Sequence, residues 1–321
     1  MKVLYWNARR IANDESRLFL RRLLQENKPD LFFLAEPKTS IQRFPTLFWQ
    51  NSHLRLFATN NKGSLCPTLC CLCEDSFSPV ILEVSDQMVS FSVTVNTQVC
   101  YFAAVYGAVN YVIRRTLWAH LIRLQEAFPS PWQFLGDFNA ILGAHEKKGG
   151  CLPIAQSCQD FIDWTQAGDL THINTRGSNF TWSNGRLDNN HIQVRLDRTV
   201  CNQQSIGFWD AISCSTLSKC HSDHYPILLV LAKGAPARAR PFRFLSVWLE
   251  HPDCRRLVTE TWKEPVVGCP MFILKSKLKR VKLALRSWNW EVFGNIHEGV
   301  RSSWQSLDSI QREIHENGRT D

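Results

Sequence analysis

Acidic, amide and imidazole side chains follow or precede short apolar runs at several places in this chain. The residues in question are Asn7, Glu36, Asp137, Asn139, Asp197, Asp223 and His224. Hydrolysis of a phosphodiester needs a hard cation held by carboxylates, a group that positions and deprotonates water, and donors for the charge that develops on phosphate. These residue types could supply all three parts.

The segment around Gly136 carries the strongest of these signals. An apolar run, Gln133 to Leu135, enters a glycine and then presents Asp137 and Asn139 two residues apart. Strand alternation would place both side chains on one side, where one could orient water and the other a phosphate oxygen. An Asx-type turn is the alternative interpretation.

Two further segments support this chemistry. Asp223 and His224 precede the apolar run Ile227 to Leu231, so that an acid could bind metal while the histidine contacts phosphate. Asp197, in a separate segment, could hold the imidazole in its protonated form.

Asn7 and Glu36 each close an apolar run, and Pro37 predicts extended backbone at Glu36. Taken singly, an asparagine or glutamate at such a place could equally be a cap or a surface residue.

The elements that must position these residues have an α/β pattern. Expected strands are 3–6, 31–35, 99–106, 133–135 and 227–231, and expected helices are 16–25, 114–128 and 158–166. Helices after strands favour parallel pairing, whereas the turn Asn184-Gly185 beside Trp182 favours a hairpin. We therefore expect mixed sheets.

The pattern changes near residue 233. Two prolines and a glycine predict a linker over 234–241, which separates a domain over 1–233 from a helical connector over 242–321. Apolar residues of the connector recur at helical spacing, first from Leu274 to Val292 and again from Val300 to Ile314. We expect these stripes to pack, because the connector also contains five of the tryptophans.

The composition excludes a chain that is disordered throughout. With 44% hydrophobic and 21% charged residues, the chain is an ordinary globular protein of net charge +8. Neither a signal peptide nor a membrane span is expected, and Cys70, Cys71 and Cys73 are interpreted as apolar strand residues. The connector is the more basic part, and its lysines and arginines between Lys275 and Arg286 could contact phosphates or form a solvated helix face.

The order of the motifs resembles the endonuclease/exonuclease/phosphatase superfamily. The motifs are Trp6-Asn7, Glu36, Tyr106, Gly136-Asp137-Phe138-Asn139, Thr181-Trp182, Arg195-Leu196-Asp197 and Ser222-Asp223-His224. The segments 34–38, 114–118, 146–150 and 179–186 resemble most closely the endonuclease domain of plant LINE-type non-LTR retrotransposons. The connector looks like the region that leads toward reverse transcriptase in those elements.

The resemblance implies a four-layer α/β/β/α sandwich of two mixed β-sheets with outer helices, followed by the helical C-terminal extension. It implies Glu36 as the principal Mg²⁺ ligand, with Asn7 and Asp223 close to the metal, and Mn²⁺ as a substitute. Asp137 would activate water and Asn139 would steady the water and the phosphate. His224 would contact phosphate, oriented by Asp197.

Tyr106, in this resemblance, contacts the phosphate or the leaving group. The implied enzyme is a DNA endonuclease that leaves a 3′-hydroxyl and a 5′-phosphate, in an intracellular and nuclear protein. Its implied partners are DNA and a reverse transcriptase domain or element RNA, without a membrane. DNA contacts are expected from Arg9, Lys38 and Trp182, although Trp182 could also be an ordinary hairpin core residue. The connector would add Lys275, Lys279 and Arg280.

Two departures from the family pattern bear on activity. Arg10 stands where the family usually has a glycine, so a positive φ there would strain the loop beside Asn7. The region from Asp188 to Arg195 is short, which leaves target preference open. An inactive or binding-only remnant, or a phosphatase or sphingomyelinase-like member of the fold, therefore stands as an alternative. The basic connector and Trp182 favour DNA.

Overall fold

The computed structural model describes residues 1–11, 13–39, 48, 52–60, 66–186, 190–234, 244 and 246–292, apart from the side chains of residues 286 and 290. The chain forms two compact units, residues 1–239 and 240–321. Each unit is described by itself.

The first unit contains a seven-stranded sheet in the order β11-β15-β16-β1-β2-β4-β3. Its strands are β1 (Lys2–Asn7), β2 (Leu31–Ala35), β3 (Leu54–Thr59), β4 (Leu69–Glu74), β11 (Thr175–Arg176), β15 (Ala211–Thr216) and β16 (Ile227–Ala232). β1 runs parallel to β2 and antiparallel to β16. The sheet is therefore mixed.

A second sheet has six strands in the order β10-β14-β8-β7-β6-β5. Its strands are β5 (Val80–Ser85), β6 (Met88–Val95), β7 (Gln98–Tyr106), β8 (Trp132–Asp137), β10 (Leu170–His172) and β14 (Asp197–Asn202). β7 and β8 are parallel and the other pairs are antiparallel. This sheet is mixed as well.

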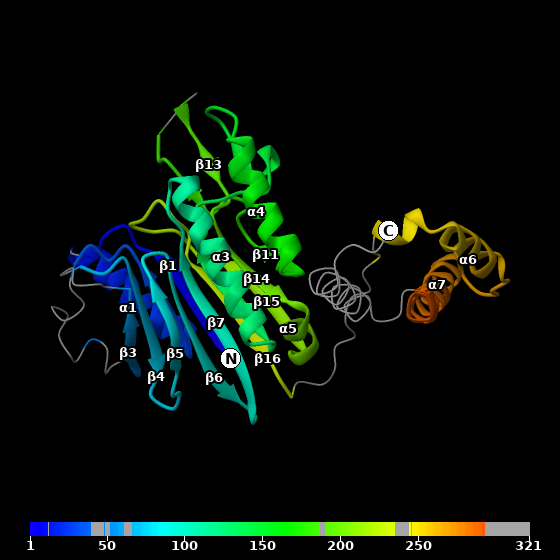
Figure 1. Ribbon diagram of the computed structural model, residues 1–321, viewed down its shortest axis with the longest axis horizontal. Helices are drawn as coiled ribbons and strands as arrows, with labels where there is room; N and C mark the ends of the chain where they lie inside the picture. The colour runs from blue at the N-terminus through cyan, green and yellow to red at the C-terminus, as the bar shows by residue number, and fades with distance from the viewer. Residues whose placement is uncertain are drawn as a thin grey trace, which may run out of the picture. The chain divides into compact units, whose positions relative to one another are not determined.

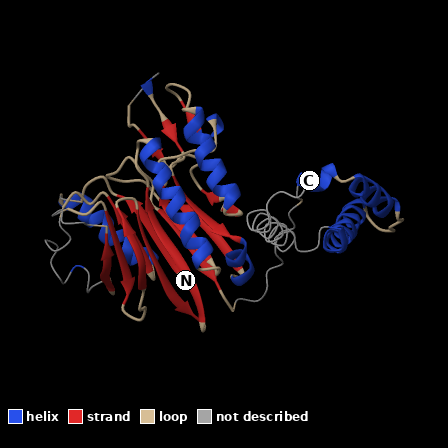
Figure 2. Cartoon of the chain, viewed as in Figure 1, coloured by secondary structure: helices blue, strands red, loops and turns tan. Residues whose placement is uncertain are grey.

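Helices cover the outer faces of both sheets (Figures 1 and 2). They are α1 (Asp14–Asn27), α3 (Tyr111–Ala127), α4 (Ala155–Ala167) and α5 (Gln203–Phe208). A small third sheet, β12-β13-β9, is formed by Trp182–Ser183, Gln193–Val194 and Lys147–Lys148, and the short 3-10 helix η2 (Ala144–Glu146) precedes β9. The four-layer α/β/β/α sandwich expected from the sequence is confirmed.

Alternation along β1 shows how the sequence builds these layers. Val3 and Tyr5 belong to the apolar core between the two large sheets, whereas Leu4 and Trp6 belong to the core beneath α1, where they pack with Leu20. All five side chains are buried, and burial of an aliphatic side chain such as Val3, Leu4 or Leu20 stabilises the fold by about 1.5–3 kcal/mol. Both faces of β1 are thus covered, which keeps its carboxyl end, and Asn7, in a fixed position.

The predicted elements lie close to the observed ones. Every expected strand and helix is present, and no end shifts by more than three residues. The side chain of Asn13 caps α1 by accepting from the Ser16 N–H, and Asn110 caps α3 in the same way through Val112. Cys70, Cys71 and Cys73 are buried in β4, as expected, and none of the twelve cysteines, all of which the structure describes, forms a disulfide.

The second unit is helical over its described residues. It contains the 3-10 helix η4 (Ser246–Glu250), α6 (Pro252–Lys263) and α7 (Pro270–Val292). A small core joins Trp248, Cys254, Leu285 and Trp288. The first predicted stripe therefore lies on α7 and packs through its C-terminal half, whereas Leu274 is exposed. The second predicted stripe, 300–314, lies outside the described residues, as does most of the predicted linker. None of the described helices is long and apolar enough to cross a membrane.

Candidate active site

Parallel strand pairs in each large sheet bring the first polar residues to one edge of the sandwich. Asn7 ends β1 and Glu36 follows its parallel neighbour β2, while Tyr106 and Asp137 end the parallel strands β7 and β8 and are paired in register. The amide nitrogen of Asn7 donates to Glu36 Oε1 at 3.2 Å and to Asp137 Oδ2 at 3.1 Å. Asn7 therefore links the ends of the two sheets.

Antiparallel strands bring the remaining residues to the same edge. Asp197 begins β14 and lies opposite Asp137 in the neighbouring strand. His224 stands just before β16, which runs antiparallel to β1, and forms a bridge with Trp182 of the small sheet. Residues that are far apart in the sequence thus meet because their strands end together.

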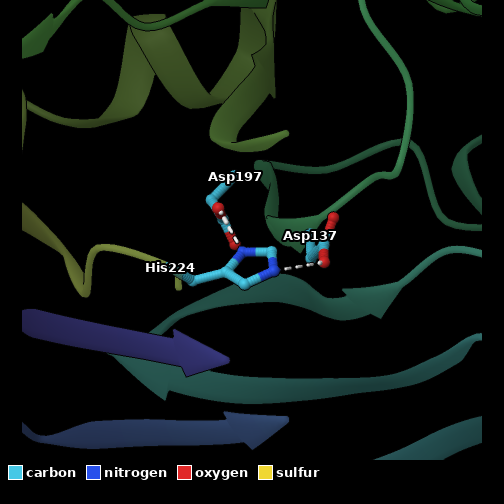
Figure 3. A group of neighbouring side chains, drawn as sticks. All are labelled: Asp137, Asp197 and His224. Atoms are coloured by element: carbon cyan, nitrogen blue, oxygen red, sulfur yellow. Dashed lines mark hydrogen bonds and ion pairs between the residues drawn. The ribbon is translucent and has the colours of Figure 1, made fainter. Parts of the chain in front are cut away.

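Asp197 and His224 form a buried pair (Figure 3). His224 Nδ1 donates to Asp197 Oδ2 at 2.8 Å, and both side chains are at most 3% exposed. Burial alone would lower the pKa of His224, but attraction to the Asp197 carboxylate outweighs it and raises the pKa to about 9. The imidazole is therefore a cation at neutral pH, as the sequence led us to expect.

Asp137 faces the other nitrogen of this ring. Its Oδ2 lies 3.8 Å from His224 Nε2 (Figure 3). Its Oδ1 accepts the Asn139 N–H at 2.9 Å. Burial and the nearby Asp197 carboxylate raise the pKa of Asp137 to about 6. A carboxylate whose pKa lies near neutrality is suited to accept a proton from water.

Glu36 is held by several donors. Its Oε1 accepts from the Tyr106 hydroxyl at 2.9 Å and from Asn7, and its Oε2 lies 3.1 Å from Lys38 Nζ. Burial would raise the pKa of Glu36, but these donors outweigh it and lower the pKa, so the group is a carboxylate. The predicted extended backbone is wrong, because Glu36 has a φ of 46°. Its N–H donates to Thr68 O at 2.8 Å, which helps to hold this turn.

Asp223 is bonded to Arg9 and Trp182. Arg9 Nε lies 3.0 Å from both carboxylate oxygens, Arg9 Nη2 donates to Oδ2 at 2.9 Å, and Trp182 Nε1 donates to Oδ2 at 2.8 Å. Burial would raise the pKa of Asp223, but the Arg9 hydrogen bonds dominate and lower it. Trp182 is only partly buried and packs on the small core of Ile141, Cys158 and Val194.

The oxygen donors of Glu36, Asp223 and Asn7 fit a hard divalent cation such as Mg²⁺. Lys38 and Arg9 already place positive charge on both carboxylates, which shows that this part of the site attracts cations. A second candidate cluster is Asp137, Asp197 and His224, whose ligand atoms lie within 4.8 Å of one another.

Two loop predictions need correction. Strand β8 ends at Asp137, and Asn139 has a φ of 47°, so alternation does not extend to Asn139. The Asn139 amide instead donates to Gly107 O at 2.9 Å, and its N–H completes an Asx-type turn with Asp137. In the first loop, the positive φ of 56° lies at Arg9 and not at Arg10, which is exposed.

The predicted DNA-contacting residues fall into two groups. Arg9, Lys38 and Trp182 lie in the site described above. Lys275, Lys279 and Arg280 are exposed on α7 of the second unit, where Arg280 pairs with Glu264 at 3.2 Å.

Ser222 and Thr181 hold the backbone of Asn7, His224 and Asp197 in place, although sequence reasoning gave them no role. The Ser222 hydroxyl donates to Asn7 O at 2.7 Å and accepts the His224 N–H at 3.0 Å. The Thr181 hydroxyl accepts the N–H groups of Leu196 and Asp197. Both residues lie inside motifs that the sequence singled out, which was the available signal.

A buried ion pair supports the small sheet beside the site. Glu146 accepts from Arg198 at 2.8 Å and 3.1 Å, and the Arg198 side chain is fully buried. Because Arg198 follows Asp197 directly, this pair also fixes the start of β14. Nothing in the sequence marked it as a pair.

A cavity of about 690 Å³ adjoins Tyr106. It is lined by loops of both large sheets and by the start of α3, through residues such as Thr68, Gln87, Ala108 and Thr116. The space lies next to the Glu36 side of the site, where it could admit part of a substrate.

Known structures share this architecture. No model of a known protein family matches the chain, and no curated protein matches it. The endonuclease domain of TRAS1, a telomere-specific non-LTR retrotransposon, is 16% identical with a TM-score of 0.55, and the match covers 73% of this chain and 99% of that domain. A 3′-5′ exonuclease (NExo) from Neisseria meningitidis is 17% identical with a TM-score of 0.55, over 73% and 100% of the two chains.

An AP endonuclease from Archaeoglobus fulgidus is 14% identical with a TM-score of 0.55, and the match covers 72% of this chain and 99% of that one. At these identities the likeness concerns the fold. The chain has the fold of the endonuclease/exonuclease/phosphatase superfamily.

Proposed function

We propose that this chain is a Mg²⁺-dependent DNA endonuclease that nicks target DNA for a LINE-type retrotransposon. The observation that carries the proposal is the facing pair of Asp137 and cationic His224, which lie 3.8 Å apart beside the Glu36 carboxylate. A proton acceptor, a cation and a metal ligand are the parts that phosphodiester hydrolysis requires. The motif order and the fold likeness to the TRAS1 endonuclease domain support the same function.

Each residue of the site would have its own role in phosphodiester hydrolysis. Asp137 accepts the proton of the attacking water, and the Asn7 amide keeps its Oδ2 in position. His224 donates from Nε2 to a phosphate oxygen, while Asp197 maintains the charge of the ring. Mg²⁺ bound by Glu36 would neutralise charge on the phosphate. Tyr106 orients Glu36 and lies close enough to the cavity to contact a phosphate or a leaving group.

DNA binding completes the proposal. Trp182, Arg9 and Lys38 flank the carboxylates, and Lys275, Lys279 and Arg280 would add contacts to the phosphate backbone. Asn139 holds the loop after β8 through Gly107, so its role is to position Asp137. Residues 1–233 would be the catalytic domain and 242–321 a connector, joined by a linker over 234–241. A reverse transcriptase domain or element RNA, and a nuclear location, belong to the same proposal.

Nicking of supercoiled plasmid in Mg²⁺ tests this function. We expect an open circular product with 3′-hydroxyl and 5′-phosphate ends, Mn²⁺ as a substitute for Mg²⁺, and nicking by His224→Ala that is slower by about 10³-fold. Folded protein that leaves the plasmid intact would show an inactive or binding-only remnant.

A phosphatase function is the second candidate. The fold neighbours include NExo, whose structure bound to a DNA hairpin product is described as a 3′ phosphatase. Release of phosphate from a 3′-phosphorylated hairpin, without nicking of the plasmid, would favour this candidate. Turnover of phosphoinositides or sphingomyelin with no action on DNA would favour a lipid phosphodiesterase.

A further inference from the structure

The two carboxylates at the open side of the site are not equally available to a cation. Of the described residues, Lys38 alone is bonded to Glu36 Oε2, and the Lys38 side chain is 53% exposed. Both Asp223 oxygens, in contrast, are occupied by Arg9, and Trp182 adds a third donor on Oδ2. An incoming ion could displace Lys38 easily, whereas at Asp223 it would have to break a forked ion pair.

Arg9 is held in this place by the backbone. Its φ of 56° lies in the left-handed region, and the Arg10 N–H closes the turn on Ala8 O. The Arg9 N–H also points to Asn7 Oδ1 at 3.2 Å. A non-glycine residue keeps such a conformation only where its surroundings enforce it, so the direction of the Arg9 side chain is built into the loop.

The charges around Glu36 and Asp223 favour the binding of one divalent cation in addition to Arg9. Arg9 Nη1 is 3.5 Å from Glu36 Oε1 and Arg9 Nη2 is 2.9 Å from Asp223 Oδ2, so the guanidinium lies between the two carboxylates and closer to Asp223. It neutralises Asp223 and repels a second cation from its surroundings. Among the described residues, Glu36 Oε2 is paired only with Lys38, whose side chain is half exposed, so its negative charge remains available to a metal ion.

We propose that Arg9 is a built-in cation that satisfies Asp223, so that the site binds one divalent ion, at Glu36, rather than two. This inference rests on the proposed metal-dependent function and deepens it. Asp223 then acts as the partner of Arg9 and is not itself a metal ligand.

Binding of Mn²⁺ to the protein without DNA tests the proposal, with free Mn²⁺ measured by electron paramagnetic resonance. We expect one ion per chain in the wild type. Arg9→Gln should bind Mn²⁺ about tenfold more tightly, because it removes a positive charge next to the carboxylates. Arg10→Gln is the matched control, since it removes an equal charge from an exposed neighbour that has no ion pair with the described residues, and we expect no change.

A charge-balanced double variant separates the two roles of Asp223. Arg9→Gln with Asp223→Asn removes the ion pair as a whole, and we expect Mn²⁺ affinity within about twofold of wild type. If Asp223 were a ligand, the double variant would bind more weakly than wild type. Two ions of similar affinity in the wild type, or an unchanged affinity in Arg9→Gln, would also overturn the proposal. These measurements need no catalysis, so an idle but metal-binding chain would refute the proposed nuclease without affecting this inference.

Discussion

The two sides of the candidate site are built differently. On the side that we propose handles protons, Asp137, Asp197 and His224 are at most 3% exposed and are joined across paired strands. On the cation-binding side, Glu36 and Asp223 are covered by Arg9 and Lys38, whose side chains are 43% and 53% exposed. The buried side is preorganised, which favours proton transfer, whereas the open side can exchange one cation for another.

Of the changes that test this difference, removal of His224 should lower the nicking rate the most. His224→Ala takes away the buried cation that faces the phosphate, and we expect nicking to fall by about 10³-fold, as for the loss of a preorganised donor. The measurement is the initial rate of plasmid nicking at saturating Mg²⁺. His145→Ala, an exposed histidine on η2, is the control and should retain the wild-type rate. Equal rates in both variants would remove His224 from the mechanism.

A change on the open side should instead alter the Mg²⁺ concentration that nicking requires. Glu36→Gln removes a charge that would face a divalent ion, so we expect the Mg²⁺ concentration for half-maximal nicking to rise by about 10²-fold. Much of the rate should return at high Mg²⁺. Titration of Mg²⁺ in the nicking assay measures this, and Glu26→Gln, on the exposed face of α1, is the matched control. A loss of rate that no Mg²⁺ concentration restores would place Glu36 among the proton-handling groups.

The pH dependence of the nicking rate should reflect the pKa values of the buried residues. Asp137 must be ionised, with a pKa of about 6, and His224 must be protonated, with a pKa of about 9. The rate should therefore rise as the pH passes 6 and fall as it passes 9. Asp197→Asn removes the charge that raises the pKa of His224, so burial lowers that pKa and the falling limb moves to lower pH.

If the pKa of His224 falls from about 9 to the ordinary value of about 6.5, we expect Asp197→Asn to lose about thirtyfold in rate at pH 8 and about twofold at pH 6.5. Nicking rates between pH 5 and 10 at constant ionic strength measure both limbs. A falling limb at the same pH in both proteins would contradict the pairing of His224 with Asp197.

Sequence patterns were most informative where the structure is repetitive. Strand and helix periodicity predicted both mixed sheets, because alternation along strands such as β1 reflects burial on two faces. Loop geometry was not predictable in the same way. The left-handed backbone of Glu36 is held by a hydrogen bond to Thr68, from another segment, and the pairing of Arg9 with Asp223 joins residues more than 200 positions apart. Local propensity contains no information about such contacts.

The smallest effect is expected for the basic residues of the second unit, whose removal should change the salt dependence of DNA binding. Lys279 is exposed on α7, and a lysine that contacts a phosphate adds about one to the slope of log affinity against log salt. Lys279→Gln should reduce this slope by about one for DNA binding measured by fluorescence anisotropy. Lys263→Gln, on the exposed end of α6, is the control and should leave the slope unchanged. Arg280→Gln should change it less than Lys279→Gln does, because Arg280 is already paired with Glu264. An unaltered slope in all three variants would mean that DNA is held by the first unit, through residues such as Arg9 and Lys38.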